Sequence, residues 1–165
     1  MTNTPCVSQE LHQASQPEQM VEYPVSDRLV LAGQPRPQDW ARLAQRDFRT
    51  VINIRSEADR AASQAEQARA AGLQYIHLPL PAYELEPEHL ATFNGVLQEA
   101  HGKILLHCRT ASRTALLWLL NRIVSESWSQ EQAEAELFAA GYDEDSMETF
   151  RYCTEDFFDR TMVPV

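Results

Sequence analysis

The chain carries the stretch Ile104-Leu105-Leu106-His107-Cys108-Arg109-Thr110-Ala111-Ser112-Arg113-Thr114-Ala115-Leu116-Leu117-Trp118, in which a His-Cys pair and a short polar loop separate two apolar runs. The first run has the length of a buried strand and the second has the spacing of a helix, so the stretch predicts strand, loop and helix. A cysteine in such a loop lies near backbone N–H groups and the positive end of a helix dipole. Both favour the thiolate, which is the nucleophilic form.

Arginines in and near this loop are suited to hold an anion. Arg113 has a planar guanidinium that grips an oxyanion with two hydrogen bonds, and Arg109 and Arg55 are further candidates. The chain as a whole has 24 acidic and 14 basic residues and a net charge of −10. The negative electrostatic field of such a chain repels nucleic acid and anionic membranes, so we expect neither as a partner. An anionic substrate must therefore be captured by a local positive site.

The composition is that of an ordinary globular protein: 165 residues with an apolar share of 44% indicate one domain with a proper core. We expect no membrane span, because no apolar run is long enough, and no secretory signal, because no basic and apolar leader is present. The three widely spaced cysteines, Cys6, Cys108 and Cys153, suit a reducing, cytoplasmic location. No ligand spacing suggests a metal site, and we expect no cofactor.

Periodicity divides the chain into a flexible, polar arm over residues 1–22 and a single domain over 23–165. Strands are expected at 28–32, 49–54, 74–78 and 104–106, and helices after Pro37 and at 57–71, 87–101, 114–124, 129–140 and 147–158. This alternation predicts an α/β fold with a central, mainly parallel sheet flanked by helices. The Cys108 loop then lies at the carboxyl end of a central strand, where such sheets bind ligands.

The loop resembles two kinds of reactive-cysteine loop. His107-Cys108 followed by Arg113-Thr114 resembles the signature of cysteine-dependent protein tyrosine and dual-specificity phosphatases, in which an Arg followed by Ser or Thr ends the loop. That signature has five residues between Cys and Arg, whereas this chain has four. The shorter loop, with an Arg directly after the Cys, is similar to that of many rhodanese sulfurtransferases, which form a persulfide on the cysteine.

Two further segments resemble the beta-lactamase-hydrolase-like phosphatases, a bacterial family of small domains related to dual-specificity phosphatases. The first, over residues 25–35, ends in Gly33-Gln34-Pro35, and the second, over 48–55, ends in Asn53-Ile54-Arg55. The resemblance extends from about Val25 to Val124 and implies a dual-specificity-phosphatase-like fold. One departure concerns Ala111, where the family usually has Gly. Because glycine permits positive φ, alanine there is expected to strain or reshape the loop.

The resemblance also implies roles for the loop residues. Cys108 would attack phosphorus and become a phosphocysteine, while Arg113 and the backbone N–H groups hold the phosphoryl oxygens. Thr114 would hydrogen-bond the sulfur, and His107 would orient the loop. The residues expected to contact the substrate between the two ends of the loop are Arg109, Thr110, Ala111 and Ser112.

The general acid is less defined by the sequence. Related phosphatases use an aspartate from a nearby loop, but the loop after residue 78 has Glu84 and Glu86 and no Asp. Asp59 is the third candidate. If none of them reaches the leaving group, the enzyme is expected to favour aryl phosphates, whose leaving groups need little protonation. Arg55 either contacts the substrate or forms an ion pair with Glu57 or Asp59.

Three functions remain open on these residues. The first is a metal-free phosphomonoester hydrolase that acts through Cys108 on a phosphorylated substrate, either an aryl phosphate or a phosphoprotein. The second is a rhodanese-like sulfurtransferase that carries a persulfide on Cys108. The third is a pseudophosphatase that binds a phosphorylated partner without turnover, which Ala111 and the missing Asp suggest.

Overall fold

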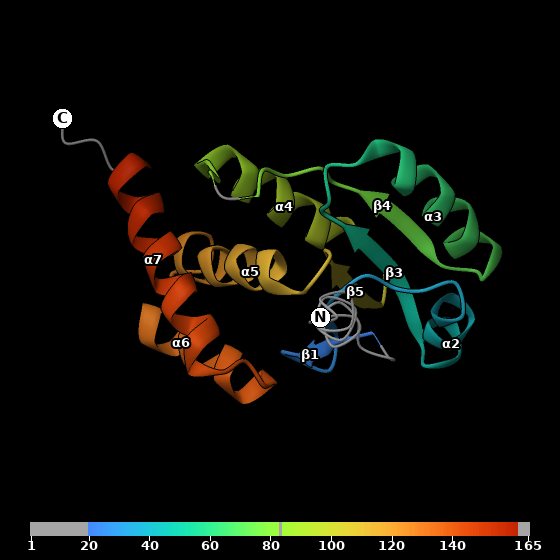
Figure 1. Ribbon diagram of the computed structural model, residues 1–165, viewed down its shortest axis with the longest axis horizontal. Helices are drawn as coiled ribbons and strands as arrows, with labels where there is room; N and C mark the ends of the chain where they lie inside the picture. Colours follow the sequence, from blue (N-terminus) through green and yellow to red (C-terminus); the bar gives the residue numbers. More distant parts are fainter. Residues whose placement is uncertain (1–19, 83, 162–165) are drawn as a thin grey trace, which may run out of the picture.

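The computed structural model describes residues 20–82 and 84–161, excluding the side chains of residues 58–60. A five-stranded sheet of order β1-β2-β5-β3-β4 lies between two layers of helices (Figure 1). All neighbouring strands are parallel except β1, which is antiparallel to β2. The strands are β1 (Glu22–Pro24), β2 (Leu29–Ala32), β3 (Phe48–Asn53), β4 (Gln74–His77) and β5 (Lys103–His107). The predicted α/β architecture is confirmed, with β5 at its centre.

The helices divide unequally between the two faces of the sheet. They are α2 (Asp39–Gln45), α3 (Ala58–Ala70), α4 (Pro87–Glu99), α5 (Ser112–Val124), α6 (Gln130–Ala140) and α7 (Glu144–Thr161). Helices α2 and α3 cover one face, and the other four lie on the opposite face (Figure 1). Because successive strand residues point to opposite faces, Leu31 and Leu106 belong to the larger core, whereas Val30 and Leu105 belong to the smaller one.

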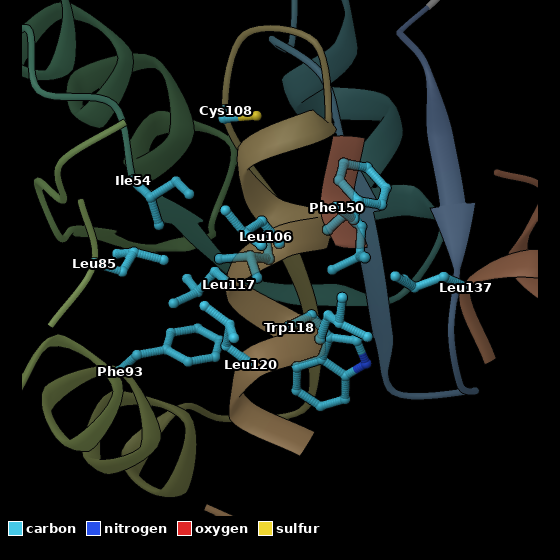
Figure 2. Packing of buried hydrophobic residues seen from close by; sticks show 14 of the residues in the cluster. Ile54, Leu85, Phe93, Leu106, Cys108, Leu117, Trp118, Leu120, Leu137 and Phe150 are labelled. Carbon is cyan, nitrogen blue, oxygen red and sulfur yellow. The ribbon is translucent and has the colours of Figure 1, made fainter. Parts of the chain in front are cut away.

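Helix α5 is the central element of the larger core. Every residue from Thr114 to Asn121 is buried, which explains why its sequence is apolar on all sides. Figure 2 shows Leu117 and Leu120 of α5 converging with Phe93 of α4 and Leu106 of β5. In the described part of the chain, no helix is both long enough and apolar enough to cross a membrane.

Helix ends follow the local signals in the sequence in most cases. Pro87 opens α4, and Ser129 caps α6 by accepting a hydrogen bond from the backbone N–H of Gln132 at 3.1 Å. The expected start of the last helix at residue 147 was wrong, since α7 begins at Glu144. Asp143 accepts the backbone N–H of Ser146 at 2.8 Å and so starts the helix before its apolar stripe begins.

The amino-terminal boundary of the fold lies slightly earlier than the sequence indicated. Residues 1–19 of the predicted arm lie outside the described residues. Within the described part, Met20 packs against the smaller core, and Glu22 pairs with Ala32 as the first residue of β1. A strand of three residues is too short to show a periodicity in sequence.

Arg122 joins α5 to α6 through contacts of two kinds. Its guanidinium lies over two indole rings, 4.4 Å from the centroid of Trp118 and 4.0 Å from that of Trp128. It also donates hydrogen bonds to the carboxylates of Glu136, at 2.7 Å, and Glu126, at 3.1 Å. The side chains of Arg122 and Glu136 are only 15% and 14% exposed, so the pair is well shielded from water.

The substitution Arg122→Gln should lower the free energy of unfolding by about 2–4 kcal/mol, because it leaves the shielded Glu136 carboxylate without its cationic partner and with only the neutral N–H of Trp118. Arg46→Gln is the matched control: Arg46 also binds a carboxylate with two hydrogen bonds, to Glu22, but its side chain is 48% exposed. Arg46→Gln should lower the free energy of unfolding by less than about 1 kcal/mol. Urea denaturation measures both, and equal losses would contradict the ranking.

Candidate active site

The Cys108 loop connects the end of β5 to the start of α5 and is attached to the neighbouring strand β2. The backbone N–H of Cys108 donates to the Ala32 carbonyl at 3.2 Å, and that of Gln34 donates to the Arg109 carbonyl at 3.1 Å. A Cβ atom on Gly33 would lie 3.1 Å from the same Arg109 oxygen. Glycine at position 33 therefore allows the close approach of the two backbones.

The Cys108 sulfur lies beneath the arch of the loop (Figure 2). Cys108 is fully buried and belongs to the larger core, so atoms that cover the sulfur must move aside when a ligand approaches it. The hydroxyl of Thr114, in the first turn of α5, lies 4.0 Å from the sulfur and donates to the Ala111 carbonyl at 3.0 Å. The structure thus brings the predicted nucleophile and its hydroxyl neighbour together.

Ala111 adopts a left-handed backbone, with φ of +68° and ψ of 7°, immediately before α5. Such a conformation costs an L-residue with a Cβ on the order of 1–2 kcal/mol. The expected strain at this position is therefore present. The loop retains the left-handed turn even though a glycine would adopt it more easily.

His107 is the last residue of β5 and is completely buried. Its Nδ1 atom lies 3.2 Å from the Cys108 carbonyl oxygen, while its Nε2 atom has no hydrogen-bond partner among the described residues. Burial, with a smaller contribution from the positive charge of Arg55, lowers the pKa of His107 to about 4. His107 is therefore neutral near pH 7, and its ring contacts the backbone carbonyl of Cys108 in the loop.

Four loop residues remain accessible to a ligand. Arg109, Thr110 and Ser112 are exposed and Arg113 is half-buried. Thr110 donates to the Ser112 hydroxyl at 3.4 Å. Arg113 forms no hydrogen bond or ion pair with the residues that the structure describes, so its guanidinium is available to an anion.

Arg55, the second predicted anion contact, is already engaged. It donates two hydrogen bonds of 3.2 Å to the Glu57 carboxylate and one of 2.7 Å to the Gln34 side chain. These bonds from Arg55, with a smaller contribution from the charge of Arg113, lower the pKa of Glu57 to about 2. Glu57 is thus an ionised carboxylate beside both arginines. The sequence identified it only as an ion-pair partner, because its position relative to Arg113 depends on the fold.

The candidate general acids are not brought to the loop by any described contact. Glu86 caps α4 with His89 and lies 3.7 Å from Arg160 of α7. Glu84 is exposed. Asp59 stands in the first turn of α3, but its side chain lies outside the described residues. Among the described residues, no hydrogen bond or ion pair joins Glu84 or Glu86 to the Cys108 loop.

Comparison with known proteins agrees with this geometry. Residues 23–125 match the family described as "Beta-lactamase hydrolase-like protein, phosphatase-like domain". A beta-lactamase hydrolase-like protein of Xylella fastidiosa is 28% identical over 124 residues, which cover 72% of this chain and 29% of that protein. The chain thus spans less than a third of that relative. The dual specificity protein phosphatase TpbA of Pseudomonas aeruginosa is 29% identical over 129 residues, 76% of this chain and 57% of that protein.

Solved structures share the fold. The crystal structure of P. aeruginosa TpbA matches with a TM-score of 0.65 and 25% identity, covering 82% of this chain and 83% of that one. The active form of Tk-PTP matches with a TM-score of 0.60 and 19% identity, covering 81% and 96%. The cysteine-phosphatase-like fold expected from the sequence is confirmed.

The substitution Ala111→Gly should raise the free energy of unfolding by about 1 kcal/mol, because relief of the left-handed strain exceeds the entropy cost of glycine. Ala115→Gly, in the right-handed and buried interior of α5, is the matched control and should lower it by at least about 1 kcal/mol. Urea denaturation compares the two. A similar loss in both variants would show that Ala111 is not strained.

Acidification should destabilise the protein through His107. His107 stays neutral in the folded state, whereas in the unfolded chain it binds a proton below its ordinary pKa of 6.5. The stability that this difference contributes is complete above pH 6.5 and is lost as the pH falls toward 4. At pH 5 the loss is on the order of 2 kcal/mol. Urea denaturation at pH 7 and pH 5 should show a smaller pH dependence for His107→Asn than for wild type. His101→Asn, at an exposed histidine, should keep the wild-type dependence; an unchanged dependence in His107→Asn would contradict the assignment.

Proposed function

Because the chain belongs to the family of beta-lactamase hydrolase-like phosphatase domains, we propose that it hydrolyses phosphate monoesters through a phosphocysteine formed on Cys108. The observation that carries this proposal is the placement of Cys108 between the central strand β5 and the buried helix α5, with Arg113, which pairs with none of the described residues, on the same loop. Free N–H groups at a helix start and a guanidinium together bind tetrahedral oxyanions.

The reaction has two steps. In the first, the Cys108 thiolate attacks phosphorus, so that a sulfur–phosphorus bond forms while the bond from phosphorus to the leaving oxygen breaks. Arg113 and the loop N–H groups hold the three remaining oxygens while charge shifts among them. In the second step, water attacks phosphorus, inorganic phosphate leaves and the thiolate returns. The Thr114 hydroxyl, 4.0 Å from the sulfur, can turn from the Ala111 carbonyl to stabilise the departing thiolate.

The proposed substrate class depends on which side chains can protonate the leaving group. Glu57 is the carboxylate beside the arginines, and its pKa of about 2 keeps it ionised at neutral pH. It therefore does not protonate a leaving group. Glu84, Glu86 and Asp59 remain the candidate acids. Aryl phosphates, including phosphotyrosine in proteins, leave as weakly basic phenoxides and need the least help, so we propose them as substrates.

A related complex supports this choice. A cysteine-to-serine form of TpbA was crystallised in complex with pTyr, and that structure matches this chain with a TM-score of 0.63 and 24% identity. The same anionic ligand would be held here by Arg113 and Arg109. Arg55 would contact it only after exchanging the Glu57 carboxylate for a phosphoryl oxygen.

The proposal predicts metal-independent hydrolysis of p-nitrophenyl phosphate in the presence of reductant, blocked by vanadate. Cys108→Ser should lose at least about a thousandfold in kcat, since the nucleophile is removed. The matched control is Cys153→Ser, in which the substituted cysteine lies on α7 and not in the loop, and it should keep wild-type activity.

A folded wild type that hydrolyses neither p-nitrophenyl phosphate nor a phosphotyrosine peptide would overturn the hydrolase proposal. The four residues between Cys108 and Arg113 favour a sulfurtransferase as the second candidate, which sulfur transfer from thiosulfate to cyanide would reveal. Binding of the phosphotyrosine peptide without turnover of either kind would instead support a pseudophosphatase.

A further inference from the structure

Tyr142 connects the turn between α6 and α7 to the Cys108 loop. The residue is buried, and its hydroxyl donates a hydrogen bond of 2.7 Å to the carbonyl oxygen of Ala111. The two residues are 31 positions apart in the chain. Ala111 is the strained, left-handed residue of the loop, so the hydrogen bond reaches the loop at its least stable point.

The ring of Tyr142 is held from two sides. It stacks on Tyr23 of β1, with the ring centroids 3.9 Å apart and the planes 18° from parallel. Phe150 of α7 meets it edge-on at 5.6 Å. Gly141, with φ of +121°, makes the approach of Tyr23 possible, because a Cβ there would lie 3.3 Å from the Tyr23 ring. Strand β1 and helix α7 thus set the direction of the hydroxyl.

The hydrogen bond also affects the amide groups of the loop. The C=O and N–H of one peptide unit point in opposite directions, so a fixed Ala111 carbonyl fixes the N–H of Ser112. Ser112 is the first residue of α5, and its N–H is one of the free donors at the helix start. Burial raises the pKa of Tyr142 above its usual value, and a charge on Cys108 raises it further, so the hydroxyl keeps its proton.

We propose that Tyr142 is a positioning residue of the phosphate-binding loop: its hydroxyl holds the Ala111 carbonyl and thereby the direction of the Ser112 N–H. The role deepens the proposed hydrolase function and rests on it. Tyr142 lies beyond residues 23–125, the segment that matches the family. This chain therefore supports its loop from outside the family's shared segment.

The first test is the substitution Tyr142→Phe, which keeps the stacked ring and removes only the hydroxyl. We expect kcat/KM for p-nitrophenyl phosphate to fall about tenfold, mainly through kcat, as the loss of one hydrogen bond held through the transition state implies. Tyr152→Phe is the matched control, because Tyr152 is 73% exposed on α7, and it should keep wild-type kinetics. Wild-type kcat/KM in Tyr142→Phe would overturn the positioning role.

A second variant separates positioning from general stability. In an Ala111→Gly background the left-handed turn no longer needs to be held against strain. Tyr142→Phe should therefore lower kcat/KM threefold or less in that background. A merely structural role would give the same loss in both backgrounds, and that result would overturn the proposal. The comparison is a double-mutant cycle on kcat/KM at a temperature where all four proteins are folded.

A third readout does not depend on turnover. Iodoacetamide should alkylate the buried Cys108 at least threefold faster in Tyr142→Phe than in wild type, because the released loop exposes the sulfur more often; mass spectrometry of the Cys108 peptide excludes signal from Cys153. An equal or slower rate would overturn the anchoring role. If wild type has no phosphatase activity, the hydrolase proposal fails, while the alkylation rate still decides whether Tyr142 anchors the loop.

Discussion

The turn from β5 into α5 depends on one strained peptide. The chain passes from the buried strand to the buried helix over Cys108 to Ala111, and it does so with a left-handed backbone at Ala111. The carbonyl of this residue is turned into the interior, where an unpaired oxygen would cost about 1–3 kcal/mol. Thr114 and Tyr142 both donate to it. The loop that surrounds the sulfur is therefore hydrogen-bonded to α5 through Thr114 and to the turn between α6 and α7 through Tyr142.

Short-range patterns in the sequence were sufficient to predict most of the fold. Alternation along the strands and the capping residues of helices act within a few positions, so the α/β architecture and the starts of α4 and α6 could be read directly. The placement of the candidate site was predictable to the same extent, because its strand, cysteine, loop and helix are contiguous in the sequence. The strain at Ala111 was expected only from the family resemblance, because glycine usually occupies this position in the family; the structure gives Ala111 a positive φ.

Contacts between distant residues could not be predicted in this way. Nothing near Tyr142 in the sequence indicates that it donates to Ala111, because the contact depends on how α6 and α7 pack against β1. The proximity of Glu57 to Arg113 has the same origin, since the two follow different strands that become neighbours only in the sheet. The start of α7 was misjudged for a local reason: its apolar stripe begins later than its cap at Asp143.

The charges around the loop support the proposed class of substrate. Against the net charge of −10, the local positive charge comes from Arg113 and Arg109, because Arg55 is neutralised by Glu57 and His107 is uncharged near pH 7. The same ion pair that occupies Arg55 also keeps Glu57 ionised, so this carboxylate does not act as an acid near pH 7. Among the described residues, two cationic side chains of the loop can hold an anion, whereas no described contact brings a proton-donating carboxyl group to the loop. This asymmetry supports the proposal that the substrates are phosphate esters with weakly basic leaving groups.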